Sequence, residues 1–282
     1  MAGVLDFLFT YLLSFSCEYV DSALGMGYGT TLTPLLLLMG YEPSVAVPAV
    51  LLSEFATGIT ASLFHSELGN FELSINSKDT RVALVLASCS IVGSVVAVLL
   101  AVELPRIVVR AYIGLLVLAM GFLVLSGHRS KSGFSWSKVI SLGLLSSFNK
   151  SISGGGYGPV IVGGQILSGI ESKRAVGITS LAEGLTCLSG LAAYVATMGW
   201  SCALSPRLAL PLVLGALAST PLAAYSVKRL DATRFRRLVG LAMLALGLLT
   251  ILRGTLPVLD SLESGAPDRL RLAQCFRSHG VY

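Results

Sequence analysis

Residues Gly25-Met26-Gly27-Tyr28-Gly29 return 129 positions later as Gly154-Gly155-Gly156-Tyr157-Gly158. Each copy interrupts an apolar run that would otherwise resemble a membrane helix. Several neighbours repeat at the same offset: Ser22 with Ser151, Glu42 with Glu171, Glu54 with Glu183, and Thr57 with Thr186. A duplicated glycine break between apolar segments is typical of the binding site of a secondary transporter, because unwound backbone there can ligate a substrate.

The composition indicates a multi-pass membrane protein. The chain has 282 residues, of which 54% are hydrophobic and 12% are charged, whereas soluble domains carry about 25% charged residues. The net charge of +5 does not indicate nucleic-acid binding, because the basic residues lie in short loops between apolar runs. The expected partner is therefore the lipid bilayer, and no nucleic acid.

The apolar segments fall into two groups. Six approach the roughly 20 residues that cross the hydrocarbon core: 45–64, 81–102, 107–126, 175–197, 207–227 and 233–252. Two pairs of shorter segments flank the glycine motifs: 4–19 with 30–39, and 138–149 with 159–168. The pattern predicts an all-α polytopic membrane protein with two pseudo-symmetric repeats. In each repeat a glycine-broken or re-entrant helix precedes three transmembrane helices.

These segments define four parts of the chain. They are a first transmembrane repeat over 1–127, a basic connecting loop over 128–134, a second transmembrane repeat over 135–253, and a flexible C-terminal tail over 254–282.

The distribution of lysine and arginine favours inverted repeats. If each broken element returns as a hairpin, all the basic residues counted lie on one side except Arg106, Arg110 and Arg207. Lys150 and the four arginines of the tail are left out of this count. A single crossing by each broken element divides the charges more evenly, so the positive-inside rule favours the hairpin, with both termini outside. A topology of eight single crossings stays open.

The glycine motifs could hold an anion. Glycine costs about 1 kcal/mol relative to alanine inside a helix, and freed backbone groups at membrane depth need partners. A short helix is expected to begin after each break, and helix starts attract anions. The candidate ligands in the motifs are Gly25, Gly27, Tyr28, Gly29, Thr30, Gly154, Gly156, Tyr157 and Gly158. The alternative is that the glycines only permit close helix packing.

Lys150 directly precedes the second motif, and its counterpart in the first half is Asp21. A charged side chain at membrane depth is by default a functional candidate. Lys150 could neutralise an anion to which Ser151 and Ser153 donate hydrogen bonds. Alternatively, Lys150 extends to an interface or pairs with Asp21 or Glu18.

Glu54 and Glu183 lie at matched positions inside two predicted membrane helices. Burial disfavours the charged form of a carboxyl group, so this pair could carry a coupling proton or bind a cation. A structural hydrogen bond to unwound backbone is the other explanation. Carboxylates beside an anion site are compatible with a bound anion only when they are protonated. Proton coupling is therefore the hypothesis that agrees with an anion site.

The duplicated break is followed by the string Ala175-Val176-Gly177-Ile178-Thr179-Ser180-Leu181. With these features, residues 1–253 resemble the TauE/SafE family of membrane transporters, the sulfite exporter or toluenesulfonate uptake family. In the first half the string is Ala46-Val47-Pro48-Ala49-Val50-Leu51-Leu52, without the threonine and serine. The resemblance implies transport of sulfur-containing anions such as sulfite or sulfonates across the plasma membrane, with Thr179 and Ser180 as further ligands. Glu54 and Glu183 lie outside the family pattern and could mark a subgroup with another coupling ion or cargo.

The sequence thus predicts a secondary transporter that moves a small sulfur-containing anion by alternating access, coupled to protons through Glu54 and Glu183. One alternative is a cation or metal-ion transporter in which Glu54, Glu183 and Asp21 bind the cargo. Another is a non-transporting scaffold or a channel. There is no nucleotide-binding loop, nucleophile elbow or metal-ligand cluster, so we expect no enzyme activity, no cofactor and no resident metal. A homodimer is left open.

Overall fold

The computed structural model describes residues 2–126, 135–167, 170–226 and 237–252. Within these ranges the regular structure is helical, and there is no strand. The labelled helices are α1 (Ala2–Leu24), α2 (Tyr28–Leu38), α3 (Pro43–Glu67), α4 (Lys78–Glu103), α5 (Arg106–Ser126), α6 (Trp136–Ser153), α7 (Gly158–Leu167), α8 (Ser172–Met198), α9 (Trp200–Ala203) and α10 (Pro206–Ser226). A last helix covers Arg237–Leu252. The predicted connecting loop 128–134 and tail 254–282 lie outside the described residues.

Five helices are long and apolar enough to cross a membrane, namely α3, α4, α5, most of α8, and most of α10. They match five of the six predicted spans, and the sixth is described only from Arg237 onward. Large apolar side chains point outward from them, including Ile91, Val92 and Phe122. An outward apolar surface is what lipid contact requires, so the prediction of an all-helical polytopic membrane protein is confirmed for the described part of the chain.

Both glycine motifs end one helix and begin another, as predicted. At the first break, Gly25 and Gly27 have φ values of 69° and 133°. At the second, Gly154 and Gly156 have φ values of 73° and 81°. Side chains with a Cβ atom rarely adopt this region, so glycine is needed where the backbone reverses.

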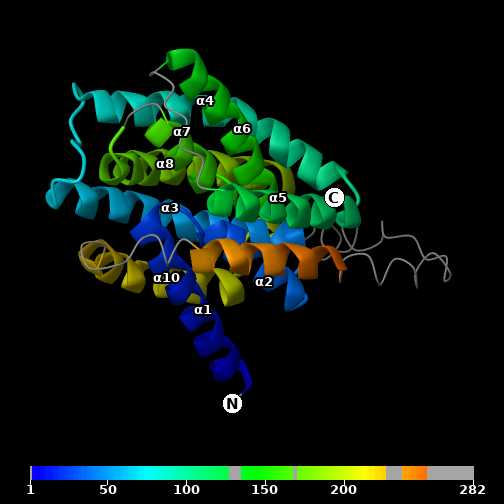
Figure 1. The fold of residues 1–282 in the computed structure, drawn as a ribbon. Helices are drawn as coiled ribbons and strands as arrows, with labels where there is room; N and C mark the ends of the chain where they lie inside the picture. Colours follow the sequence, from blue (N-terminus) through cyan, green and yellow to red (C-terminus); the bar gives the residue numbers. More distant parts are fainter. Residues whose placement is uncertain (1, 127–134, 168–169, 227–236, 253–282) are drawn as a thin grey trace.

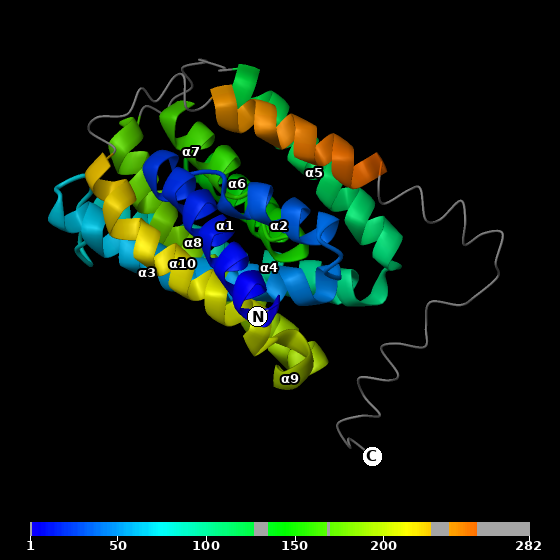
Figure 2. The ribbon, with the colours of Figure 1, turned by 90° about the horizontal axis from the view of Figure 1, so that it is seen from below.

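The short helix after each break turns back instead of continuing the preceding helix. Gly164, near the end of α7, packs against Leu142 in the first half of α6. In both Figure 1 and Figure 2, α2 likewise turns back after the break instead of continuing the line of α1. The chain therefore forms two helical hairpins whose tips are the glycine motifs.

The tips of the two hairpins lie against each other. A Cβ atom on Gly29 would collide with the carbonyl oxygen of Gly154. A Cβ atom on Gly158 would collide with the carbonyl oxygen of Gly25. Glycine is required at 29 and 158 by this close approach of two backbones and not by a positive φ.

The long helices α3 and α8 cross at glycines. A Cβ atom on Gly58 would lie 2.7 Å from the Cα of Gly184. Further along, Cys187 lies near Glu54 and Gly190 lies near Leu51. Residue numbers rise on one helix as they fall on the other, so α3 and α8 are antiparallel. Glu54 and Glu183 lie near this crossing, at the centre of the molecule.

Helix α5 packs on the last helix through a second set of glycines. A Cβ atom on Gly114 would lie 3.2 Å from the carbonyl oxygen of Gly247, and one on Gly121 would lie 3.0 Å from that of Gly240. Close backbone approach through small residues is a usual way for membrane helices to pack. Figure 2 shows these two helices side by side along one flank.

Candidate functional site

A buried ion cluster occupies the centre of the molecule, beside the two hairpin tips. Lys150, near the end of α6, is 1% exposed. Its Nζ forms ion pairs with Oε2 of Glu54 on α3 and, at 2.6 Å, with Oε1 of Glu183 on α8. A lone charge at membrane depth is costly, so the two carboxylates and the lysine stabilise one another. The matched glutamates therefore meet at Lys150, and Lys150 pairs with neither Asp21 nor Glu18.

Glu54 connects Lys150 to the start of a half-helix. Its Oε1 accepts a hydrogen bond from the backbone N–H of Gly29, at 3.3 Å. The first N–H groups of a helix have no partner within that helix and carry a partial positive charge. The carboxylate of Glu54 consequently lies between a helix start and an ammonium group, which is a typical environment for a bound anion.

Two further acids extend the cluster from α1. Oδ1 of Asp21 accepts a hydrogen bond from the N–H of Tyr28, at 3.2 Å. Oε1 of Glu18 accepts one from the hydroxyl of Ser22, at 2.6 Å. Oε2 of Glu18 is buried and has no hydrogen-bond partner. The first two N–H groups of α2 are thus bound by carboxylates of the chain itself, one from α1 and one from α3.

These acids line one small cavity. Its polar lining residues are Glu18, Asp21, Ser22, Glu54, Thr57, Ser180 and Glu183. The free space is about 10 Å³, which is enough for about one water molecule. In this conformation the cavity has no room for a multi-atom anion, so such a ligand needs the side chains or the helices around the cavity to move.

The other predicted ligands of the first motif have partners within the protein. The hydroxyl of Tyr28 bonds to those of Ser14 and Ser53, at 2.8 and 2.7 Å. The hydroxyl of Thr30 donates to the carbonyl oxygen of Gly27. Tyr28 therefore joins α2 to α1 and α3, and this contact fixes the first hairpin beside the ion cluster.

The predicted ligands around the second motif make contacts within the hairpin or with neighbouring helices. The hydroxyl of Ser153 accepts a hydrogen bond from the N–H of Gly155, at 3.1 Å, so it caps the turn. Ser151 donates to the hydroxyl of Ser94 on α4, at 2.7 Å. Tyr157 is fully buried, among apolar side chains that include Ile161. None of these side chains makes a hydrogen bond to the ion cluster among the contacts described.

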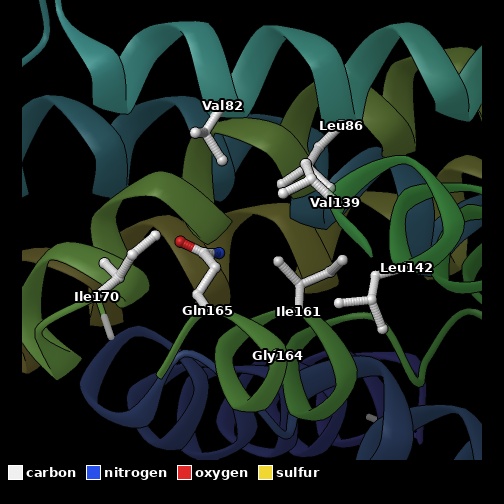
Figure 3. A pocket seen from close by; sticks show the side chains of 8 residues that line it. All are labelled: Val82, Leu86, Val139, Leu142, Ile161, Gly164, Gln165 and Ile170. Carbon is white, nitrogen blue, oxygen red and sulfur yellow. The ribbon is translucent and has the colours of Figure 1, made fainter. Parts of the chain in front are cut away.

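The two ligands implied by the family string lie in different surroundings. Ser180 lines the acidic cavity. Thr179 accepts a hydrogen bond from the amide nitrogen of Gln165 on α7, at 2.9 Å. Figure 3 shows Gln165 in a separate, largely apolar pocket, between Ile170 and Ile161 of α7 and below Val82 of α4. Thr179 therefore connects the end of α7 to α8 and does not reach the ion cluster directly.

Sequence reasoning considered Glu18 only as a possible partner of Lys150, and it did not select Cys187, whose thiol lies 3.9 Å from Oε2 of Glu54. A signal for Glu18 was present. Glu18, Asp21 and Ser22 are spaced three and four residues apart inside an apolar run, and that spacing places them on one face of a helix. No spacing could indicate Cys187, because its proximity depends on the crossing of α3 and α8.

A metal centre is not found in this part of the protein. Across the described ranges, no group of three or more histidine, cysteine, aspartate or glutamate side chains is arranged to hold a metal ion. Of the four acids that line the cavity, Glu54 and Glu183 instead form ion pairs with Lys150.

Comparisons with known proteins agree with this architecture. A family model described as "Sulfite exporter TauE/SafE" matches residues 11–250. The chain is also similar to a protein described as "Probable membrane transporter protein YtnM" from Bacillus subtilis (strain 168), with 29% identity over 252 residues. That match covers 85% of this chain and 80% of the relative. No solved structure matches.

Proposed function

Because the chain belongs to the TauE/SafE family of multi-pass membrane transporters, we propose that it is a proton-coupled secondary transporter of a small sulfur-containing anion, such as sulfite or a sulfonate. In this proposal the anion binds to Lys150 and to the start of α2. Glu54 and Glu183 take up protons as it binds. Transport follows alternating access, in which the two halves of the chain rock against each other around this site.

One observation carries the proposal: a carboxylate of the protein lies where an anion would bind. Glu54 accepts a hydrogen bond from the N–H of Gly29 and pairs with Lys150. A sulfur oxyanion has several acceptor oxygens and a negative charge, so it could replace Glu54 at both contacts. Glu54 thus acts as an internal competitor of the substrate.

Proton uptake would decide this competition. Protonation of Glu54 removes its charge, weakens its pairing with Lys150 and frees the N–H of Gly29. Protonation of Glu183 releases the other contact of Lys150, which is 2.6 Å long. The lysine then needs a new negative partner, because an unpaired charge at membrane depth is costly. Anion affinity should therefore rise as the pH falls, and anion and protons would move in the same direction.

The anion class follows from the donors and from the family. The family description names sulfite. The site offers an ammonium group and helix-start N–H groups, which suit a compact oxyanion with acceptors on more than one side. The cavity of about 10 Å³ means that the anion would enter only with displacement of the Glu54 side chain or opening of the surrounding helices.

Reciprocal contacts support the proposed relation between the halves. Gly29 and Gly25 of the first motif correspond in sequence to Gly158 and Gly154 of the second. The approach of Gly29 to Gly154 therefore has a counterpart in the approach of Gly158 to Gly25. The antiparallel crossing of α3 and α8 is also what inverted repeats would produce. A pseudo-two-fold axis between the hairpin tips would give each half the same contacts with the site.

A cation transporter is the second candidate, and one observation favours it: four acidic side chains line a single cavity. Lys150 argues against it, since an ammonium group already occupies the position between Glu54 and Glu183 where a bound cation would be placed.

Thermal unfolding of the purified protein tests the two candidates. The ligands are sulfite, short sulfonates, sulfate, thiosulfate, short carboxylates and divalent cations, each at acidic and at neutral pH. A ligand that binds the native state raises the melting temperature. We expect stabilisation by a sulfur oxyanion, larger at acidic pH, that is absent in Lys150→Met and retained in the matched variant Lys173→Met, whose lysine is exposed. Stabilisation by cations alone, abolished in Glu54→Gln, would support the cation candidate.

A further inference from the structure

We propose that Glu18 is a third proton-carrying group, which holds a proton in this conformation and passes it across the cavity to Glu54. The inference deepens the proposed function and rests on it for the direction of proton movement. The protonation of Glu18 itself rests on separate observations of the structure.

The first observation is an unsatisfied oxygen. Glu18 is 2% exposed. Its Oε1 is bonded to the hydroxyl of Ser22, whereas its buried Oε2 has no hydrogen-bond partner. A buried charged oxygen without a donor carries a large desolvation cost. A hydrogen atom on Oε2 removes the charge, so the neutral acid is the form that fits this environment.

The second observation is the charge around Glu18. The acidic groups near it come from three helices: Asp21 from α1, Glu54 from α3 and Glu183 from α8. The weakly acidic side chains of Cys17 and Tyr28 also lie close by. Helix α10, which packs along α1, carries only Arg207 and Tyr225, near its two ends. His65 of α3 lies beside the backbone of Ser22, and Lys150 contacts Glu54 and Glu183. The charged groups nearest Glu18 are therefore acidic and favour its protonated form.

The third observation is a path. Glu18 and Glu54 line the same cavity, whose volume of about 10 Å³ suits about one water molecule. The proton would leave Oε2 of Glu18, pass through this water and bind the carboxylate of Glu54. Glu18 would become a carboxylate and Glu54 a neutral acid, so this step creates no net charge, and Glu18 would then take up a new proton from solution. Lys150 would then be free of Glu54 and available to the anion.

The test compares two transport modes of Glu18→Gln in lipid vesicles, with a labelled short sulfonate as substrate. Exchange of sulfonate across the membrane needs no net proton movement, whereas uptake driven by a pH gradient does. We expect exchange to be retained. Gradient-driven uptake should fall by at least about tenfold, because a positioned proton donor speeds proton transfer by factors of about a hundred or more. Glu67→Gln, on the exposed end of α3, is the matched control and should behave like the wild type.

Infrared spectroscopy tests the proton on Glu18 without transport. Without substrate at neutral pH, the wild type should show a carbonyl band of a protonated carboxyl group that is lost in Glu18→Gln and shifted in Glu18→Asp. Gradient-driven uptake at the wild-type rate, loss of exchange together with uptake, or an unchanged band would each overturn the proposal. If the wild type exchanges no sulfonate, the proposed function fails, while the infrared band still decides whether Glu18 holds a proton.

Discussion

At the scale of single residues, the protein places a charged lysine at membrane depth and stabilises it with two carboxylates. Lys150 is almost completely buried, and it is tolerated because Glu54 and Glu183 both contact it. Two carboxylates and one ammonium group carry one excess negative charge. Each proton taken up by Glu54 or Glu183 makes the net charge of the cluster more positive by one. Proton uptake therefore favours binding of an external anion.

Removal of the lysine should destabilise the protein in a pH-dependent way. In Lys150→Met the two carboxylates lose their counter-ion, and breaking a buried ion pair typically costs about 3–5 kcal/mol. The loss should be largest at neutral pH and smaller at acidic pH, where the carboxyl groups can be neutralised by protons. Melting temperatures over a pH series, with Lys173→Met as the control, measure this. An equal loss at every pH would contradict the assigned charges.

Removal of the charge of Glu54, which competes with the substrate for Lys150, should strengthen anion binding. Glu54→Gln keeps the size of the side chain but removes its charge, so Lys150 and the N–H of Gly29 become more available. At neutral pH the sulfonate should bind more tightly to this variant than to the wild type. Isothermal titration provides the dissociation constants. Weaker binding in Glu54→Gln would indicate that Glu54 helps to hold the ligand, as the cation candidate requires.

The sequence predicted which residues belong to the ion cluster, but it did not predict which of them contact one another. Lys150, Glu54 and Glu183 were selected because charged residues at membrane depth are rare. Their mutual contact could not be predicted, because it depends on how α3 and α8 cross. Thr179 illustrates the opposite case: the family string singles it out, but its hydrogen bond to Gln165 places it beside another pocket.

At the scale of elements, the two hairpin tips determine where the helix starts point. Their backbones touch at Gly29 with Gly154 and at Gly158 with Gly25. Repeated glycines indicated a break in each half, and the structure has both breaks at the predicted positions. The contact between the breaks is a tertiary feature, and a pattern along the chain contains no information about it.

A methyl group at either contact should separate the tips. Gly29→Ala and Gly158→Ala both place a Cβ atom against a backbone carbonyl, and overpacking of this kind costs about 1–3 kcal/mol. We expect lower melting temperatures and loss of sulfonate binding. Gly163→Ala, in the same half-helix as Gly158 but with no atom near its new Cβ, is the control. Unchanged binding in Gly29→Ala would show that the tips are not part of the site.

At the scale of the whole molecule, one ion pair joins elements of the two halves away from the centre. Arg174 of α8 donates to both oxygens of Asp79 on α4, at 2.6 and 3.2 Å. Asp79 is buried, whereas about half of the Arg174 side chain is exposed. Such a contact would stabilise the conformation in which these ends of α4 and α8 are together.

Loss of this pair should favour a more open protein. In Asp79→Asn the charge is removed and the stabilisation lost is about 1 kcal/mol, the upper value for a partly exposed pair. Cys187, which is fully buried beside Glu54, should then react faster with a thiol reagent. The assay uses a protein with Cys17→Ser and Cys89→Ser, which removes the other free cysteines of the described residues. Arg174→Gln should give the same increase. An increase in only one of the two variants would contradict a role for the pair itself.

The overall class of the protein was predictable because lipid imposes simple demands. Apolar runs of spanning length predicted α3, α4, α5, α8 and α10 to within a few residues of their observed ends. The distribution of lysine and arginine favoured hairpins, and α7 does fold back on α6. The relation between the two halves as inverted repeats stays a prediction, which the reciprocal glycine contacts support.

The most direct test of the central claim is to count the protons taken up when an anion binds. A short sulfonate is the ligand of choice because it does not itself titrate near neutral pH. A pH indicator in weakly buffered solution reports the uptake by the purified protein. The account predicts net uptake in the wild type, at most one proton for Glu54 and one for Glu183, and none in Glu54→Gln/Glu183→Gln, which should still bind the sulfonate. Binding to the wild type without proton uptake, or the same uptake in the double variant, would contradict it.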